Sequence, residues 1–210
     1  MERLAIIGAS GHGKVVADAA LCAGWQEIIF FDDAWPKLTR ACDWAIVGGI
    51  DALLKGAHSF NGVVIAVGNN ATREKIAKNL SKAGLLMTTI IHPSATVSRY
   101  ATIGSGSVIF AGAVLNPDCH IGENCIINTN ASIEHDCVLA DGVHVSPNAS
   151  LGGQVSIGYL SWIGIGASVK QQISIGQRVI VGAGAAVVSN IPDNATAVGV
   201  PARITKIREG

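Results

Sequence analysis

The sequence predicts an α/β domain followed by an all-β solenoid of short parallel strands, and three observations support this division. Strand-like and helix-like segments alternate from Arg3 to about Met87. From Ile91 onward, aliphatic residues recur with a strict period of six. Hydrophobic residues make up 49% of the 210 residues but aromatic residues only 5%, so aliphatic side chains supply most of the apolar content. We therefore expect two domains, residues 1–88 and residues 89–210.

The N-terminal part has the order of elements that builds a parallel sheet flanked by helices. Residues 3–8 are typical of a buried strand, and residues 11–24 have the apolar spacing of a helix that ends at a glycine. Three further strands and one further helix are expected at residues 27–33, 44–48, 62–70 and 71–84.

In the C-terminal part, every sixth residue is Ile, Leu or Val without interruption. A unit of this length has room for one short strand and one corner, so it can bury its aliphatic side chain only by stacking on similar units. Three units make one triangular coil, which places residues eighteen apart above one another at the strand spacing of about 4.8 Å. The sequence therefore predicts nearly six coils. The seventeen positions are Ile91, Val97, Ile103, Ile109, Leu115, Ile121, Ile127, Ile133, Leu139, Val145, Leu151, Ile157, Ile163, Val169, Ile175, Val181 and Val187.

Charge and hydropathy argue against two classes of partner. The fifteen basic and fifteen acidic residues cancel, and the chain has no run of Lys or Arg that would attract nucleic acid or an anionic membrane surface. Its apolar stretches are far shorter than the roughly 20 residues that a membrane-spanning helix needs. We therefore expect a cytoplasmic protein that binds neither nucleic acid nor membrane.

The five cysteines include no CxxC pair, and their odd number argues against a disulfide framework. Cys119, Cys125 and Cys137 each follow an aliphatic position of the repeat by four residues, where the side chain is expected to point inward. Reduced thiols that pack as small hydrophobic groups are the favoured interpretation, and a catalytic thiol is the alternative.

The segment IEHDCV sets His135 between Glu134 and Asp136 in a region that is otherwise apolar or small. His135 comes two residues after the inward Ile133, so it should lie at a corner and point outward. An imidazole that is oriented by a carboxylate is a suitable general base at neutral pH. A solvated corner histidine without a catalytic role is the alternative.

The motif GASGHG has glycines at positions 8, 11 and 13, which is GxxGxG and not the GxGxxG of dinucleotide-binding domains. It follows a predicted strand and opens a predicted helix, so its backbone N–H groups could hold a phosphate. Asp32 and Asp33 end the next strand, where a carboxylate commonly accepts hydrogen bonds from a ribose. An NAD-dependent enzyme would fit these features but would leave the repeats unexplained.

Taken together, GASGHG, the repeats with IEHDC, and the closing VGVPAR resemble the NeuD/PglD-like sugar acyltransferases over essentially the whole chain. The resemblance implies a Rossmann-like UDP-sugar-binding domain followed by a left-handed β-helix. It also implies transfer of an acetyl group from acetyl-CoA to the 4-amino group of a UDP-4-amino-4,6-dideoxy-sugar of the bacillosamine type. It further implies a homotrimer with active sites between protomers, and we expect no metal.

By the same resemblance, His135 is the general base and Asp136 the carboxylate that increases its basicity. The family often has Glu at the second position, so the shorter Asp136 leaves Glu134 as an alternative partner of the histidine. Gly153 lies eighteen residues after His135, and its backbone N–H is a candidate donor to the developing oxyanion. A glycine that is needed only for a tight corner is the alternative.

The resemblance also assigns His144, Ile165 and Ala183 to acetyl-CoA. Ile165 and Ala183 are eighteen residues apart and should stack, whereas thirty residues separate His135 from Ile165, which places these two at different corners of the triangle. One ligand could contact both corners only if two chains contributed, which agrees with the expected trimer. The UDP part of the substrate is assigned to Ser10, Gly11, His12, Asp32, Asp33 and Gly68.

Two other functions fit parts of the sequence. In a sugar O-acetyltransferase of the sialic-acid type, a hydroxyl group would replace the amine as acceptor. In a non-catalytic trimeric scaffold, the repeats would serve assembly alone and the N-terminal domain would only bind a sugar nucleotide. Trp162, eighteen residues after His144, is either a wall of the acetyl-CoA groove or, as the favoured alternative, a surface aromatic that stabilises the trimer.

Overall fold

The structure is a computed structural model that describes residues 2–85 and 87–208. The chain divides into two compact units, one up to Pro93 and the other from Ser94 onward. The elements of the first unit are β1 (Arg3–Ile7), α1 (Gly11–Cys22), β2 (Glu27–Phe31), β3 (Arg40–Ala41), β4 (Trp44–Ala45), α2 (Ile50–Gly56), the short 3-10 helix η1 (Ala57–Ser59), β5 (Gly62–Ile65), α3 (Asn70–Lys82) and β6 (Ile90–Ile91).

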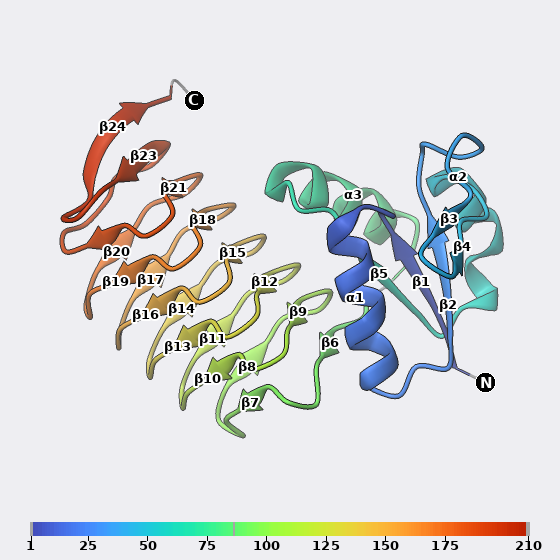
Figure 1. Cartoon of the computed structure of the whole chain (residues 1–210), viewed down its shortest axis with the longest axis horizontal. Coiled ribbons are helices and arrows are strands. Elements are labelled where there is room, and N and C mark those ends of the chain that lie inside the picture. The colour runs from blue at the N-terminus through green and yellow to red at the C-terminus, as the bar shows by residue number, and fades with distance from the viewer. Residues whose placement is uncertain (1, 86, 209–210) are drawn as a thin grey trace. The chain divides into compact units, whose positions relative to one another are not determined.

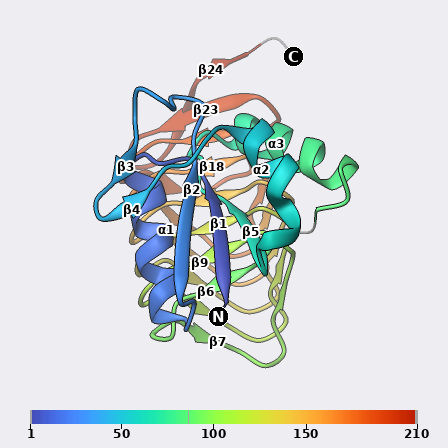
Figure 2. The same ribbon diagram turned by 90° about the vertical axis from the view of Figure 1, so that its right-hand side faces the viewer.

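The first unit is built on a parallel sheet with strand order β2-β1-β5. Alternate side chains of these strands point to opposite faces. Ala5 and Ile7 belong to a buried cluster with Leu53 of α2 and Leu80 of α3, which places both helices on one face. On the other face α1 packs closely, because Gly13 lies against the ring of Phe30. Figure 2 shows α1 on the side of the sheet opposite α2.

One predicted strand takes a different form. Residues 44–48 were expected as a full strand of the parallel sheet, but β4 contains only Trp44 and Ala45 and pairs antiparallel with β3. The chain then runs beside β2 through an isolated bridge between Ile46 and Phe30. It leaves the sheet at a pair of glycines, Gly48 and Gly49, after which α2 begins. The glycine pair therefore cuts this strand short.

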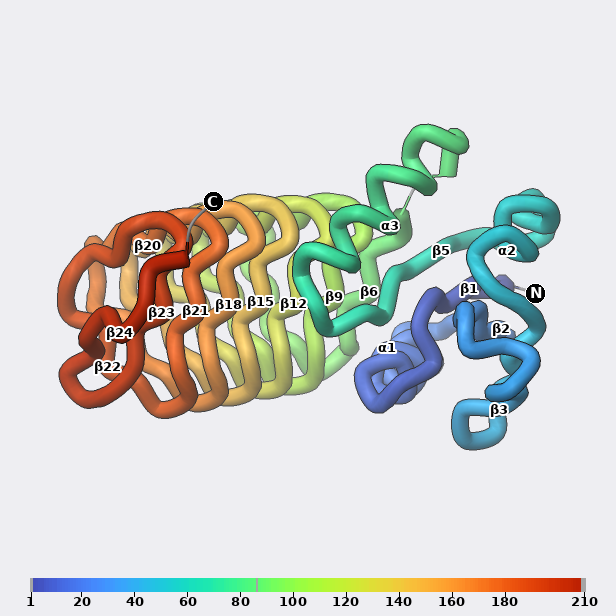
Figure 3. Tube along the Cα trace, turned by 90° about the horizontal axis from the view of Figure 1, so that it is seen from above, coloured from blue at the N-terminus to red at the C-terminus, as the bar shows by residue number. Residues whose placement is uncertain are grey.

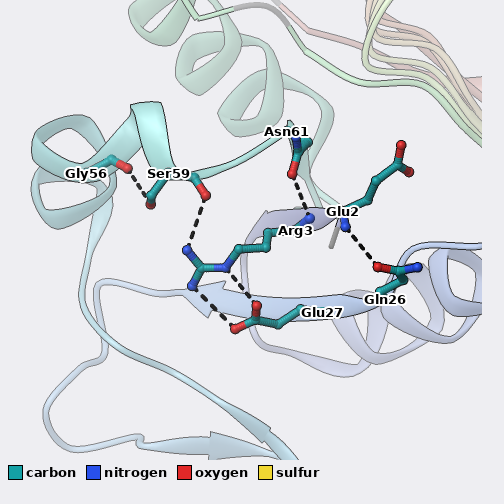
Figure 4. Close-up of polar contacts among 7 residues, drawn as sticks. All are labelled: Glu2, Arg3, Gln26, Glu27, Gly56, Ser59 and Asn61. Atoms are coloured by element: carbon teal, nitrogen blue, oxygen red, sulfur yellow. Dashed lines mark hydrogen bonds and ion pairs between the residues drawn. The ribbon is translucent and has the colours of Figure 1, made fainter.

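A polar network fastens the amino ends of the strands (Figure 4). The Arg3 guanidinium donates to both carboxylate oxygens of Glu27, at 2.7 and 3.3 Å, and to the carbonyl oxygen of Ser59 at 3.2 Å. The Arg3 N–H donates to the side chain of Asn61. These contacts join β1, β2 and the segment before β5 at one edge of the sheet and leave the opposite, carboxyl edge to the candidate ligand-binding residues.

The second unit is a parallel β-helix in which residues eighteen apart pair, for example Ser132 with Ser150 and His144 with Trp162 (Figures 1 and 3). Its three sheets have the strand orders β22-β19-β16-β13-β10-β7, β20-β17-β14-β11-β8 and, from β24 to β9, β24-β23-β21-β18-β15-β12-β9. The strands are β7 (Thr96–Val97), β8 (Thr102–Ile103), β9 (Val108–Ile109), β10 (Val114–Leu115), β11 (His120–Ile121), β12 (Ile126–Ile127), β13 (Ser132–Ile133), β14 (Val138–Leu139), β15 (His144–Val145), β16 (Ser150–Leu151), β17 (Ser156–Ile157), β18 (Trp162–Ile163), β19 (Ser168–Val169), β20 (Ser174–Ile175), β21 (Ile180–Val181), β22 (Ala186–Val187), β23 (Ala195–Val198) and β24 (Arg203–Ile207).

The periodic residues form the core of this unit. Each of its sixteen strands from β7 to β22 ends on the aliphatic residue that the period of six predicts, as does β6 of the first unit. From Ile109 onward all of these side chains are buried, whereas Ile91 is 38% exposed and Val97 and Ile103 are partly buried. Near the end of a stack a coil has a neighbour on one side only, so its apolar side chain is covered less completely.

Candidate active site

His135 lies on the turn that joins β13 to β14, with a side chain that is 60% exposed. Its Nδ1 is 2.7 Å from Oδ2 of Asp136. Asp136 has a φ of 59°, the left-handed conformation that Asp tolerates better than most residues other than glycine, so the turn itself places this carboxylate next to the ring. An Nδ1–H that donates to the carboxylate leaves Nε2 as the free basic nitrogen.

Glu134 does not make the contact with His135. Its Oε2 accepts a hydrogen bond from Nδ2 of Asn116 at 3.0 Å, one coil earlier. Of the two carboxylates that flank the histidine, Asp136 is therefore the one that orients the ring. Asn116 was not singled out from the sequence, although its position eighteen residues before Glu134 is a signal that would have found it.

Gly153 occupies the equivalent corner of the next coil and lies directly against the imidazole. A Cβ added at Gly153 would be only 2.6 Å from both Cε1 and Nε2 of His135. The predicted stacking of these two residues is confirmed, since the N–H of Gln154 donates to the carbonyl oxygen of His135 at 2.9 Å. Among the described residues the Gly153 N–H has no hydrogen-bond acceptor, which leaves this donor available beside Nε2.

The three cysteines of the β-helix are packing residues, as the repeat predicts. All three are buried, and their thiols donate to backbone carbonyl groups, Cys119 to Glu134 at 3.0 Å and Cys137 to Gly152 at 3.2 Å. Burial raises the pKa of Cys119 and raises the pKa of Cys137 to about 11. Because the thiolate is the reactive form, these groups are poor nucleophiles at neutral pH.

His144 lies on a second face of the β-helix, at the start of β15, and is held on two sides. Its Nε2 is 3.3 Å from Nδ2 of Asn128. The ring of Trp162 stacks on it, with centroids 5.5 Å apart and planes inclined by 5°. Trp162 is itself fixed, because its Nε1 donates to Oγ of Ser146 at 2.7 Å. Asn128 and Ser146 were not predicted from the sequence, although both directly follow an inward aliphatic residue on this face.

Ile165 and Ala183 stack at the corner where this face meets the sheet of β13. The N–H of Gly184 donates to the carbonyl oxygen of Ile165 at 2.8 Å, which brings the two coils into register, and Ile165 is 59% exposed. His135 lies at the next corner, between the sheets of β13 and β14. The structure therefore brings Ile165 and Ala183 together and keeps His135 on a different edge of the same unit.

In the first unit, the predicted nucleotide-binding residues follow the carboxyl ends of three adjacent parallel strands. Ser10, Gly11 and His12 come after β1, and Gly68 comes after β5. A Cβ added at Gly13 would be 2.1 Å from the carbonyl oxygen of Gly8, so only glycine allows α1 to start this close to the strand. The carboxyl edge of a parallel sheet is where α/β domains bind ligands.

The two aspartates after β2 hold the surrounding loops. Oδ2 of Asp32 accepts the N–H of Ala9 at 2.8 Å, and its Oδ1 accepts the N–H of Ala34 at 2.9 Å. Oδ1 of Asp33 is 3.2 Å from the N–H of Ile50. Beside Asp33 lies an open cleft of about 710 Å³, lined by Asp33, Trp35, Val47, Gly48, Gly49, Ile50, Asp51, Ala52 and Lys55.

His12 has an unusual environment for a histidine at the start of a helix. Burial, together with the charge of Arg73, lowers the pKa of His12 to about 4. Its imidazole is therefore neutral at physiological pH.

Within residues 2–85 and 87–208, no group of three or more His, Cys, Asp or Glu side chains is arranged to hold a metal ion. Over the same residues, no helix combines the length and the apolar character needed to cross a membrane.

Comparison with known proteins connects both units to sugar acyltransferases. Residues 3–80 match the PglD N-terminal domain, and residues 100–135 and 118–153 match the bacterial transferase hexapeptide (six repeats). The UDP-N-acetylbacillosamine N-acetyltransferase of Bacillus subtilis (strain 168) is 43% identical over 114 residues, which is 53% of this chain and 52% of that protein. The chain thus matches about half the length of this curated relative.

Two solved structures match over almost their entire length. The acetyltransferase domain of PglB from Neisseria gonorrhoeae FA1090, in complex with acetyl coenzyme A, is 41% identical, with a TM-score of 0.92 and coverage of 97% of this chain and 98% of that chain. PerB from Caulobacter crescentus, in complex with CoA and GDP-perosamine, is 35% identical, with a TM-score of 0.93 and coverage of 98% of both chains. With both halves of the molecule matched in this way, the chain belongs to the PglD-like sugar acyltransferases of the hexapeptide-repeat class.

Proposed function

We propose that this protein is an acetyl-CoA-dependent N-acetyltransferase that acts on the amino group of a nucleotide-linked amino sugar. The observation that carries the proposal is the contact of 2.7 Å between His135 and Asp136, which presents Nε2 as a base on an exposed corner of the β-helix. The likeness to an acetyltransferase domain in complex with acetyl coenzyme A and to a protein in complex with GDP-perosamine supports the two substrate classes.

The finer proposal concerns the acceptor. A UDP-4-amino-4,6-dideoxy-sugar of the bacillosamine type, acetylated at the 4-amino group, agrees with the curated relative that is named for UDP-N-acetylbacillosamine. PerB is in complex with a GDP-linked sugar instead. A nucleotide panel therefore has to include both UDP and GDP.

The proposed mechanism is direct transfer from the thioester to the amine. As the amine nitrogen attacks the thioester carbonyl carbon, Nε2 of His135 takes a proton from the amine nitrogen, and Asp136 stabilises the resulting imidazolium. The N–H of Gly153 is the candidate donor to the oxyanion of the tetrahedral intermediate. When the carbon–sulfur bond breaks, the imidazolium returns the proton to the departing thiolate of CoA.

We further propose that the protein acts in the cytoplasm as a homotrimer, with each active site between two protomers. This rests on the separation of His135 from Ile165 and Ala183, which lie on different corners of the unit. A pantetheine arm that follows the edge marked by Ile165 and Ala183 would meet His135 only on a neighbouring chain.

The test of this function is an acetyl-transfer assay with separate panels of UDP-amino sugars, GDP-amino sugars and sialic acids. We expect an added acetyl group, read by mass spectrometry, on an amino sugar. Transfer only to a hydroxyl group of a sialic acid would replace the proposal by O-acetylation. Absence of acetyl-CoA binding in calorimetry would favour a non-catalytic scaffold.

The role of the base is tested by His135→Ala. We expect kcat to fall by about 10²- to 10⁴-fold, the usual contribution of a positioned general base, with the circular dichroism spectrum unchanged. His120→Ala is the matched control, because His120 is an exposed histidine of the same unit that contacts Thr102 and not the candidate site. If the two variants had equal activity, His135 would not be the base.

A further inference from the structure

Arg73 is a buried cation at the edge of the first unit that carries the predicted nucleotide-binding residues. It lies in the first turns of α3, and its side chain is only 1% exposed. Burying a guanidinium group is unfavourable unless its N–H groups find acceptors. The acceptors that Arg73 contacts therefore indicate its role.

The Arg73 guanidinium donates hydrogen bonds to the loop between β5 and α3. Its Nη1 donates to the carbonyl oxygen of Val67 at 2.9 Å and is 3.4 Å from that of Gly68. Its Nη2 donates to Oδ1 of Asn70 at 2.9 Å. The planar guanidinium can serve these acceptors together, which a lysine ammonium group cannot do with the same geometry.

This loop between β5 and α3 packs against the turn after β1. A Cβ added at Gly8 would be 2.7 Å from the carbonyl oxygen of Ala66 and 3.1 Å from Cγ2 of Val67. A shift of the β5–α3 loop would therefore also move the GASGHG turn. By holding the loop that contains Gly68, Arg73 thus also supports the adjacent GASGHG turn.

The contacts of Arg73 also shape the electrostatics of this edge. Two carbonyl oxygens that would repel an anion are directed at the guanidinium. Charged groups near this edge include Asp32 and Asp33, whose carboxylates are engaged by backbone N–H groups, and the exposed Lys14. Glu74, which follows Arg73 on α3, is buried and forms an ion pair with Lys78. After burial, the positive charge of Arg73 is the second cause of the low pKa of His12, which is neutral at physiological pH.

We propose that Arg73 is a positioning residue for the diphosphate of the sugar nucleotide: its guanidinium turns the Val67 and Gly68 carbonyl groups away from the ligand and supplies a positive charge behind the loop. The proposal rests on the proposed function, because it assumes that this edge binds a nucleoside diphosphate. A purely structural role would predict a loss of stability without any change in preference for the diphosphate.

The test is calorimetry of UDP, UMP and uridine, and of GDP, GMP and guanosine, binding to the full-length protein and to Arg73→Lys. We expect the affinity for the nucleoside diphosphate to fall at least tenfold and the ratio of diphosphate affinity to monophosphate affinity to fall with it, because lysine keeps the charge but cannot hold the Val67 and Gly68 carbonyl groups away from the second phosphate. Lys75→Gln is the matched control, since Lys75 is an exposed cation on the same helix, and its removal should change both affinities less than twofold.

A measurement on the unaltered protein covers the case in which Arg73→Lys does not fold. An anion bound beside His12 and Arg73 should stabilise the protonated imidazole, so saturation with whichever of UDP and GDP binds should raise the pKa of His12 in an NMR titration. If the variant folds, an unchanged ratio of diphosphate to monophosphate affinity overturns the role of Arg73. If it does not fold, an unchanged His12 titration overturns it. Failure of the unaltered protein to bind either UDP or GDP would instead overturn the proposed function.

Discussion

The imidazole of His135 packs against Gly153, and the absence of a side chain there determines which positions the ring can occupy. The φ of Gly153 is not in the left-handed region, so its backbone would accept an alanine. The obstacle is the ring itself, whose Cε1 and Nε2 are each 2.6 Å from the position of an added Cβ. The absence of a Cβ at Gly153 therefore leaves the space that the His135 ring occupies.

Gly153→Ala should displace the imidazole and lower kcat by about 10- to 100-fold, because a misplacement of about 1 Å can have this effect on a reacting group. The free energy of unfolding should change little, since His135 can swing toward solvent. Steady-state kinetics and chemical denaturation would measure both quantities. Gly56→Ala is the control, because nothing lies within 4 Å of an added Cβ at Gly56. Equal kcat values for the two variants would contradict the argument.

His12 should make the stability of the first unit depend on pH. In the unfolded chain His12 binds a proton below about pH 6.5, whereas in the folded chain it does so only below about pH 4. Between these values the unfolded state holds more protons, so the free energy of unfolding falls as the pH falls. The full shift corresponds to about 3 kcal/mol.

Chemical denaturation at pH 7, 5.5 and 4.5 would measure this effect by comparing the unaltered protein with His12→Gln. The unaltered protein should lose more stability across this range than the variant, which has no titrating group at this position. Parallel curves would show that His12 is solvated and titrates normally in the fold.

At the scale of single elements, the β-helix could be predicted almost strand by strand because its signal is local and repeated. Each strand needs only one aliphatic residue on the inner side, and an error at one position would be corrected by its neighbours eighteen residues away. Residues 44–48 had no such support. There the apolar sequence predicts an extended segment, which the structure contains, but Gly48 and Gly49 end it before it can join the sheet as a full strand.

The candidate site was only partly predictable for a related reason. The period of six places His135 at a corner, but it does not determine which neighbouring carboxylate turns toward the ring. That depends on the left-handed φ of Asp136 and on Asn116, which holds Glu134 one coil away. Arg73 was not singled out either, because a charged residue in a predicted helix is expected to face solvent.

The contribution of one inner strand residue can be measured at Leu151. This side chain is fully buried in the middle of the stack, with coils on both sides. Leu151→Ala should lower the free energy of unfolding by about 2 to 5 kcal/mol, the usual range for such a cavity. Ser150→Ala, on the outward side of the same strand, should change it by less than about 0.5 kcal/mol. Similar effects of both would mean that the coil is not packed as described.

At the scale of the whole molecule, the corners of the β-helix divide the proposed chemistry. The corner between the sheets of β13 and β14 carries His135, and the corner between the sheets of β18 and β19 carries Ile165, with Ala183 stacked on it. If each active site takes its base from one protomer and its acetyl-CoA edge from the next, a substitution at one corner inactivates only the sites to which the altered chain contributes that corner.

This division predicts complementation between two inactive variants. His135→Ala removes the base, and Ala183→Trp should block the acetyl-CoA edge at an exposed position that tolerates a large side chain. In a cyclic trimer that contains both kinds of chain, one of the three junctions joins an intact His135 to an intact Ala183, so about one site in three should be active. Each variant alone should be inactive. Co-refolding the two variants, followed by an acetyl-transfer assay, would measure the recovery, with a mixture of the separately folded trimers as control. Recovery no greater than in that control would place the whole site within one chain.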